Sequence, residues 1–193
     1  MCFHAQQTQS ATAVHQRFQA SGPVSQGSYN GFAHPAMTVL TDQLPHRLQL
    51  YHWGLIPHWA KDSSIQKYTL NARMETLSEK PSFRKAGRCL VIADGFFEWQ
   101  WQDPRGHKKQ KYQITLPDNA LFAFAGLWDV WTHPSTGVKQ YSCAIVTQAA
   151  VGVMKEIHNS KLRMPLILPP NAEQDWLQGQ AVAAVTSFKA TPI

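Results

Sequence analysis

Residues 88–101 of this chain read RCLVIADGFFEWQW, a short apolar run rich in Val, Ile and aromatic side chains. Runs of this length and composition are typical of β-strands. Because such runs are not regularly interleaved with long helices, a parallel doubly wound sheet is disfavoured. We therefore predict one α+β domain that is mostly β. The other strand-like runs are MTVL (37–40), RLQLYHWGL (47–55), KYQITL (111–116), LFAFAGLWDVW (121–131), YSCAIVTQ (141–148) and MPLILP (164–169).

A few short helices are expected beside these strands. Residues 8–20 (TQSATAVHQRFQA) predict a helix that carries Val14 and Phe18 on one face. Two further short helices are expected at about 151–157 and 171–178. Helices of this length only cover a sheet in part, which agrees with a mostly-β domain.

Two segments are predicted to be irregular. Residues 21–35 (SGPVSQGSYNGFAHP) are dense in Gly, Pro, Ser and Asn, which indicates a long loop. Residues 103–106 (DPRG) have the composition of a turn between two strands. This turn places a group of basic residues at a hairpin tip: His107, Lys108, Lys109 and Lys111.

Composition narrows the class of protein. The 193 residues suit one domain, and no apolar run reaches the length of a membrane span or resembles a signal peptide, so a cytoplasmic location is expected. Three cysteines without a CxxC spacing indicate neither a disulfide framework nor a zinc ribbon, and nine scattered histidines without HExxH disfavour a dedicated metal site. No cofactor is expected. The net charge of +6 and seven tryptophans favour a polyanion such as single-stranded nucleic acid, although a solvated basic surface and a tryptophan-rich core also account for them.

Glu98 lies inside an aromatic run. If Gly95–Trp101 is a strand, Phe97, Trp99 and Trp101 share one face, while Phe96, Glu98 and Gln100 share the other. Bulky aromatic neighbours remove water from a carboxylate, which raises its pKa and suits it to proton transfer near neutral pH. The alternative is a glutamate on the exposed face of an edge strand.

His158 follows the apolar segment 151–157 at a predicted helix end. A histidine at such a junction can exchange protons or orient a substrate oxygen. It can equally cap the helix C-terminus, where a cationic imidazole is favoured. The residues alone leave both roles open.

Asn71 and Arg73 belong to the polar sequence NARMET (71–76). In an extended segment both side chains point the same way, so a neutral hydrogen-bonding group lies beside a guanidinium that fits phosphate. A structural Asn turn and a surface salt bridge from Arg73 form the alternative.

Trp53 and Trp59 lie on either side of a Gly- and Pro-containing turn, WGLIPHW (53–59). Exposed indole rings at such a turn would form a stacking platform for a base. Buried rings would instead make a packed corner.

Cys2 directly follows Met1. Because its side chain is small, removal of Met1 is expected, and that exposes an amine and a thiol on one residue. The amine condenses with an aldehyde to an iminium, and the thiol then closes a thiazolidine ring. The ordinary pKa values, about 7.7–8.0 for the amine and about 8.5 for the thiol, leave both reactive forms available near neutral pH. The alternative is a cysteine that has no function at this position.

Five features in this order resemble one family. They are the N-terminal cysteine, WGLIPHWAKD (53–62), LNARMETL (70–77), CLVIADGFFEW (89–99) and IHNSKLRMPLIL (157–168), and they resemble the SRAP family of SOS-response-associated peptidases, or abasic-site processing proteins. The resemblance implies a single SRAP-like domain over residues 1–193, with barrel-like antiparallel sheets. It implies a sensor that crosslinks to abasic sites in single-stranded DNA and protects the lesion in the DNA damage response. A monomer that associates with the nucleoid is the simplest expectation.

Residue roles follow from the same resemblance. Cys2 is implied as the nucleophile, with Asn71 positioning it and with Glu98 and His158 handling protons. For contact with DNA, we expect Arg73 and Arg163 to bind phosphates, together with stacking by Trp53 and Trp59.

Two departures and two alternatives accompany the resemblance. Phe3-His4 stands where many family members have Gly-Arg, which changes the edge that DNA approaches. The chain stops at Ile193, where the family usually continues, so a truncated C-terminus is one expectation. A thiol peptidase with Cys2 as nucleophile, acting on other proteins or on its own N-terminus, and a non-catalytic single-strand DNA-binding module remain the alternative functions.

Overall fold

Five strands close into a barrel in the computed structural model, which describes residues 2–193. β10 pairs with β9 on one side and, in parallel, with β4 on the other, so the ring β10-β4-β3-β6-β9 returns to β10. The pairings β4–β3, β3–β6 and β6–β9 are antiparallel. Closure leaves few open sheet edges. The barrel strands are β3 (Ala36–Thr41), β4 (Gln49–Trp53), β6 (Gly87–Ala93), β9 (Phe122–Thr132) and β10 (Lys139–Ala149).

Three short strands extend the barrel along its two longest strands. β5 (Asn71–Arg73) pairs in parallel with β10, and β11 (Arg163–Pro165) pairs antiparallel with the end of β10. β12 (Ile167–Leu168) pairs with β9. β5 and β11 therefore reach the same end of β10, which brings two distant parts of the chain together.

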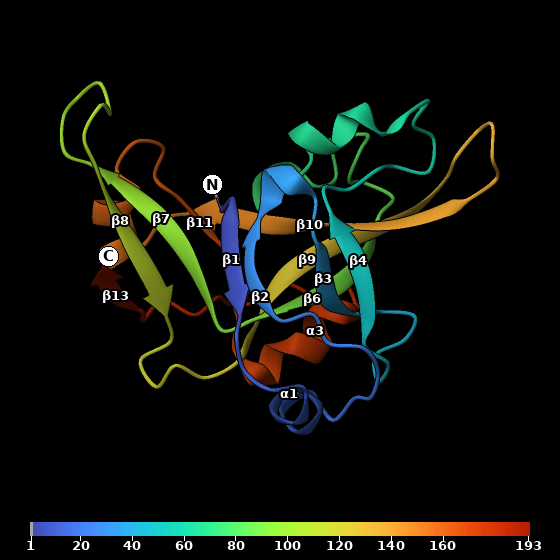
Figure 1. The fold of residues 1–193 in the computed structure, drawn as a ribbon, viewed down its shortest axis with the longest axis horizontal. Coiled ribbons are helices and arrows are strands. Elements are labelled where there is room, and N and C mark those ends of the chain that lie inside the picture. Colours follow the sequence, from blue (N-terminus) through green and yellow to red (C-terminus); the bar gives the residue numbers. More distant parts are fainter. Residues whose placement is uncertain (1) are drawn as a thin grey trace.

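A second sheet of five strands lies beside the barrel and has the order β13-β8-β7-β1-β2. The segment 88–101 joins the two sheets, because β6 ends at Ala93 and β7 begins at Gly95. Figure 1 shows β7 and β8 as a hairpin on the left, while the β9–β10 hairpin projects to the right. The strands are β1 (His4–Gln7), β2 (Gly27–Asn30), β7 (Gly95–Trp101), β8 (Lys109–Thr115) and β13 (Lys189–Pro192).

The predicted helices are present and short. They are α1 (Ala11–Phe18), α2 (Val153–Ile157) and α3 (Glu173–Leu177). Ser10 caps α1 by accepting a hydrogen bond from the Ala13 N–H, and Val14 and Phe18 are buried on one face as expected. Within residues 2–193, four 3₁₀ turns complete the regular structure: η1 (Gly31–Ala33), η2 (Ser63–Tyr68), η3 (Met74–Thr76) and η4 (Pro170–Ala172). The mostly-β prediction is therefore confirmed.

Buried apolar side chains form two main clusters. One continues from the barrel strands into the second sheet and includes Cys2, Phe96 and Phe124. The other lies under α1 and α3 and includes Phe18 and Trp176. The first cluster encloses Cys2, the predicted nucleophile, so this residue does not lie on a loose chain end.

The prediction of a loop over residues 21–35 is wrong in part, because β2 and η1 lie there. β2 is an edge strand with one partner, β1, in the register His4↔Asn30 to Gln7↔Gly27. Gly, Ser and Asn are poor strand formers by local preference, and the pairing partner supplies the stabilisation. β1 itself gave no strand pattern in the sequence.

Candidate active site

The N-terminal strand enters the middle of the second sheet. β1 pairs with β7 in the register His4↔Phe97, and with β2 on its other side. Cys2 comes just before this strand and is completely buried. The Asn71 side-chain amide donates a hydrogen bond of 2.8 Å to the Cys2 carbonyl oxygen. β5 therefore fixes the backbone of Cys2 from the barrel side.

Burial keeps the Cys2 thiol protonated. Removal of water raises its pKa well above the ordinary value, and the nearby Glu98 carboxyl raises it further. The thiol contacts the His4 carbonyl oxygen at 3.7 Å. A neutral thiol is a poor nucleophile until a base or an electrophile is close to it. Met1, whose removal the sequence predicts, lies outside the described residues.

β7 lies between β8 and β1 and is therefore an internal strand of the second sheet. Glu98 lies on the buried face of β7. Phe96 and Glu98 are buried, whereas Phe97, Trp99 and Trp101 are half-buried, which matches the two predicted faces except at Gln100, which is also half-buried. Burial raises the pKa of Glu98 to about 7. The desolvated alternative is therefore confirmed, and the carboxyl is poised to give or accept a proton near neutral pH.

His158 ends helix α2 and faces Glu98. Its Nδ1 accepts a hydrogen bond of 3.0 Å from the Arg163 backbone N–H, so the proton of the neutral ring belongs on Nε2. That Nε2 lies 3.8 Å from a carboxylate oxygen of Glu98. Burial lowers the pKa of His158 to about 4. A neutral ring does not provide the cationic helix cap, although the His158 N–H does close the helix on the Met154 carbonyl.

Asn159 ties the His158 loop to β7. Its side chain accepts a hydrogen bond of 3.0 Å from the Trp101 N–H and donates one of 2.9 Å to the Trp101 carbonyl oxygen. The amide thus pairs with β7 as a neighbouring strand would. Gln100 adds a further bond, 3.1 Å, to the Glu156 carbonyl oxygen. These contacts hold α2 against the strand that carries Glu98.

A pocket of about 210 Å³ opens over Glu98 and His158. Its other lining residues were absent from the predicted site: Phe3, Trp99, Trp101, Lys109, Ser160 and Lys161. The sequence contained part of the signal for these residues, because aromatic residues alternate along β7 and lysines follow the turn at 103–106. What it lacked was the pairing of Trp101 with Lys109 across β7 and β8. Aromatic and basic side chains at the mouth fit bases and phosphates.

The two arginines predicted to bind phosphate lie close together but differ in setting. Arg163 makes two hydrogen bonds to the Glu75 carboxylate, 2.6 and 2.9 Å, and one of 2.7 Å to the Thr147 carbonyl oxygen. The bond from Arg163 holds the pKa of Glu75 below its usual range. Arg73 is exposed on β5. Arg73 is thus an exposed residue, whereas the Arg163 guanidinium is already bonded to Glu75 and Thr147. Phosphate binding by either stays a prediction.

Trp53 belongs to the core. It has no exposed surface, and its indole N–H donates a hydrogen bond of 2.9 Å to the Leu70 carbonyl oxygen. A base cannot stack on a ring without an exposed face. Trp53 therefore forms the packed corner, the second of the two alternatives, and the predicted stacking role does not fit it.

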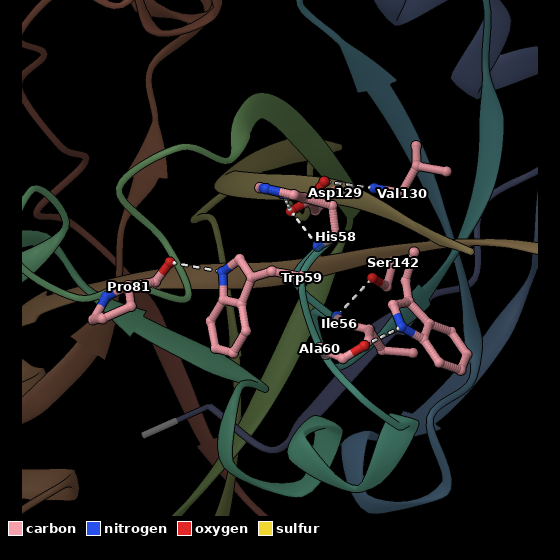
Figure 2. Close-up of polar contacts among 9 residues, drawn as sticks. Ile56, His58, Trp59, Ala60, Pro81, Asp129, Val130 and Ser142 are labelled. Atoms are coloured by element: carbon pink, nitrogen blue, oxygen red, sulfur yellow. Dashed lines mark hydrogen bonds and ion pairs between the residues drawn. The ribbon is translucent and has the colours of Figure 1, made fainter. Parts of the chain in front are cut away.

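Trp59 has the opposite setting, with 51% of the residue exposed. Figure 2 shows its indole reaching toward Pro81, whose carbonyl oxygen accepts a hydrogen bond of 3.4 Å. The neighbouring His58 is held by Asp129, which accepts its backbone N–H at 2.9 Å and lies 2.9 Å from its ring Nδ1. The turn thus presents Trp59 in a defined position, and stacking on it stays a prediction.

Potential metal ligands are scattered over the described part of the chain. Among residues 2–193, no three His, Cys, Asp or Glu side chains come together as a metal site requires. The helices within the same residues are too short and too polar to span a membrane.

The raised pKa of Glu98 predicts a pH-dependent stability difference. A carboxyl whose pKa rises from 4.5 to about 7 on folding stabilises the folded state most below pH 4.5, and this contribution is lost as pH rises to 7. Glu98→Gln removes this loss, so above pH 7 the variant is expected to be more stable by up to about 3 kcal/mol. Denaturant unfolding of both proteins from pH 4 to 8 measures the difference.

The comparison with wild type matters because His158 changes the stability with pH in the direction opposite to that of Glu98. Its lowered pKa costs stability as pH falls from 6.5 toward 4. Only the difference between wild type and Glu98→Gln isolates the carboxyl. An equal difference at every pH would contradict the assignment, and Glu156→Gln, at an exposed position on α2, is the control.

Fold and site together define a class of mostly-β domain in which a buried N-terminal cysteine lies beside a glutamate–histidine pair. The chain belongs to the SOS response associated peptidase (SRAP) family, whose sequence model matches residues 1–191. The family resemblance of the five motifs is thereby confirmed.

Named relatives agree with this membership. The chain is 45% identical over 144 residues to the abasic site processing protein YoqW of Bacillus subtilis (strain 168), covering 73% of this chain and 62% of that protein. It is 34% identical over 199 residues to the abasic site processing protein HMCES of Gallus gallus, covering 89% of this chain and 55% of that protein. The chain thus spans only part of the length of these relatives.

Solved structures share the fold. A crystal structure of a protein from Bacteroides thetaiotaomicron matches with a TM-score of 0.89 at 31% identity, over 100% of this chain and 92% of that one. A phage-related protein of Bordetella bronchiseptica matches with a TM-score of 0.71 at 23% identity, over 100% of this chain and 94% of that one. The second likeness concerns the fold alone.

Proposed function

We propose that this chain recognises abasic sites in single-stranded DNA and joins to them covalently through Cys2. The observation that carries the proposal is the burial of Cys2 next to Glu98, with Asn71 bonded to its carbonyl and His158 facing the same carboxyl. Relatives at 45% and 34% identity bear the name abasic site processing protein. An aldehyde-bearing lesion is the substrate that an aminothiol at this position suits best.

The proposed reaction begins with the α-amine of Cys2, which is available once Met1 has been removed. The abasic sugar opens from its ring form to an aldehyde, and the amine adds to the aldehyde carbon. Loss of one water, with uptake of the proton that the anomeric hydroxyl released on ring opening, gives an iminium. The Cys2 sulfur then attacks the same carbon, the thiol proton leaves, and a thiazolidine ring closes without any oxidant or reductant.

Glu98 is proposed to move the protons of this sequence. With a pKa of about 7, the carboxyl is partly protonated at neutral pH and can donate to the ring oxygen as the sugar opens. The resulting carboxylate can later take the proton of the Cys2 thiol. One residue thereby serves both steps, and its burial is what makes both protonation states accessible.

His158 and Asn71 are proposed to position the reacting groups. The Nε2 atom of His158 lies 3.8 Å from the Glu98 carboxylate, and its N–H can donate a hydrogen bond to the hydroxyl released on ring opening. Asn71 holds the Cys2 carbonyl and so restricts rotation of the amine and thiol about the Cys2 backbone. Such orientation lowers the entropic part of the reaction barrier.

Selectivity is proposed to come partly from the lesion. A nucleotide without a base costs no pairing or stacking energy when it enters the pocket. Lys109 and Lys161 line the pocket and are proposed to contact the flanking phosphates, and Arg73 is a further candidate. Contacts from these residues to the sugar–phosphate backbone of DNA do not depend on the base sequence.

A single oligonucleotide experiment tests the proposal. Single-stranded DNA with one abasic site, made by excising uracil, is expected to form an adduct that survives denaturing electrophoresis, whereas the same strand with uracil intact forms none. Mass spectrometry is expected to find protein without Met1 plus DNA, less one water. Binding that denaturant abolishes would point to a non-catalytic binding module, and DNA-independent cleavage of peptides to a thiol peptidase.

A further inference from the structure

Two phenylalanine rings, Phe3 and Phe32, contact each other beside the pocket. Phe3 directly follows Cys2 and lines the pocket with Glu98 and His158. Its ring centroid lies 4.9 Å from that of Phe32, with an angle of 33° between the planes. Phe3 is half-buried, whereas Phe32 is 56% exposed. An apolar aromatic surface therefore continues from the residue beside the cysteine out into solvent.

The backbone holds this pair in place. The Gly31 N–H donates a hydrogen bond of 2.8 Å to the Phe3 carbonyl oxygen, which joins η1 to the N-terminal segment. The Asn30 side chain accepts the Phe32 N–H at 3.1 Å. A Cβ at Gly31 would lie 3.3 Å from both the Phe3 carbonyl oxygen and the Trp53 ring, so the approach is close. Phe32 is thus presented by a fixed turn, which reduces the entropy lost when a ligand binds.

We propose that Phe32, backed by Phe3, stacks on the base of the nucleotide next to the abasic position. This inference rests on the proposed function. The abasic sugar must reach Cys2, so the adjoining nucleotide passes over the residue that follows Cys2. Every base presents an aromatic face, so one ring accepts any sequence. Stacking on Phe32 therefore favours a DNA strand that has lost one base but keeps the neighbouring base.

Binding is measured separately from the covalent step. In the first oligonucleotide, a tetrahydrofuran spacer, which has no aldehyde, replaces the abasic nucleotide between two ordinary nucleotides. In the second, the two neighbours are also spacers without bases. Fluorescence anisotropy gives the Kd of wild type, Phe32→Ala and Phe32→Leu for each. Tyr141→Ala is the matched control, because Tyr141 is an exposed aromatic residue near the start of β10, in the barrel, and does not line the pocket.

Stacking predicts a specific pattern. Phe32→Ala is expected to weaken binding of the first oligonucleotide by about 5- to 150-fold, the range measured for base–aromatic stacking, and to leave the second unchanged. Phe32→Leu, which keeps apolar bulk, is expected to recover only part of the loss. Replacing one neighbour at a time identifies whether the stacked base lies 5′ or 3′ of the lesion.

Two outcomes would overturn the inference: an equal loss on both oligonucleotides, or no loss on the first. Thermal unfolding of each variant shows whether the exposed position alters stability. The proposed function fails in a different way, because wild type would then form no denaturant-resistant adduct with an abasic strand. If Phe32→Ala weakens binding only when the neighbouring bases are present, but wild type forms no adduct, then stacking on Phe32 is supported and the covalent reaction of Cys2 is rejected.

Discussion

Cys2→Ala is expected to abolish the denaturant-resistant adduct with abasic single-stranded DNA. Without the sulfur, the iminium formed by the α-amine has no ring to close and returns to aldehyde and amine by hydrolysis. The amine itself remains, provided that Met1 is removed from the variant. Borohydride, which reduces an iminium to a stable amine, is therefore expected to trap Cys2→Ala on the same DNA. The measurement is denaturing electrophoresis with and without borohydride.

The control uses another buried cysteine. Cys143 is completely buried in the barrel and burial raises the pKa of its thiol to about 12, as burial also raises that of Cys2. Cys143→Ala is expected to keep the adduct, since its sulfur lies in β10 and has no reactive amine beside it. If Cys2→Ala forms the adduct as well as wild type does, the thiazolidine mechanism is wrong. Failure of borohydride to trap Cys2→Ala would instead contradict attack by the amine.

Glu98→Gln is expected to slow adduct formation by about 10²- to 10⁴-fold, the usual contribution of a general acid–base group. Glutamine has nearly the same shape but gives and accepts no proton. The wild-type rate is expected to change with pH around 7, where the Glu98 carboxyl titrates. The variant is expected to lose this component and to keep only the dependence of the α-amine, whose ordinary pKa is about 7.7–8.0. Single-turnover rates at saturating protein, measured from pH 5.5 to 8.5, provide both results.

Binding distinguishes loss of proton transfer from loss of structure. Glu98→Gln is expected to bind a strand with a tetrahydrofuran spacer as tightly as wild type, because the pocket keeps its shape. Glu156→Gln, at an exposed position of the neighbouring helix α2, should retain the full rate. An unchanged rate in Glu98→Gln at all pH values would exclude the carboxyl from the reaction.

Much of the fold was predictable from local patterns. The segment 88–101 forms two strands, the helix at Ala11–Phe18 buries Val14 and Phe18, and the turn at 103–106 joins β7 to β8. Each of these depends on residues close in sequence. β1 and β2 were missed because their short polar sequences gain stability from being paired, and a pairing partner cannot be read from the strand itself.

The site shows the same division. Glu98 could be assigned to a desolvated face, because its aromatic neighbours are adjacent in the chain. Trp53 and Trp59 could not be told apart, since both belong to one seven-residue motif, yet one is completely buried and the other is half-exposed. Arg163 and Glu75 are far apart in sequence, so their ion pair had no local signal.

The kinds of reactive group, and their order along the chain, follow from the sequence alone: a cysteine behind Met1, an amide on β5, a desolvated carboxyl and a histidine at a helix end. Their convergence depends on tertiary structure. Three tertiary contacts bring these four residues together: β1 pairs with β7, β5 pairs in parallel with β10, and the Asn159 side chain hydrogen-bonds to the Trp101 backbone. The physical reason is that distant segments make contacts only once they pack against one another. The same packing excludes water, and the loss of water shifts the pKa values of Cys2, Glu98 and His158.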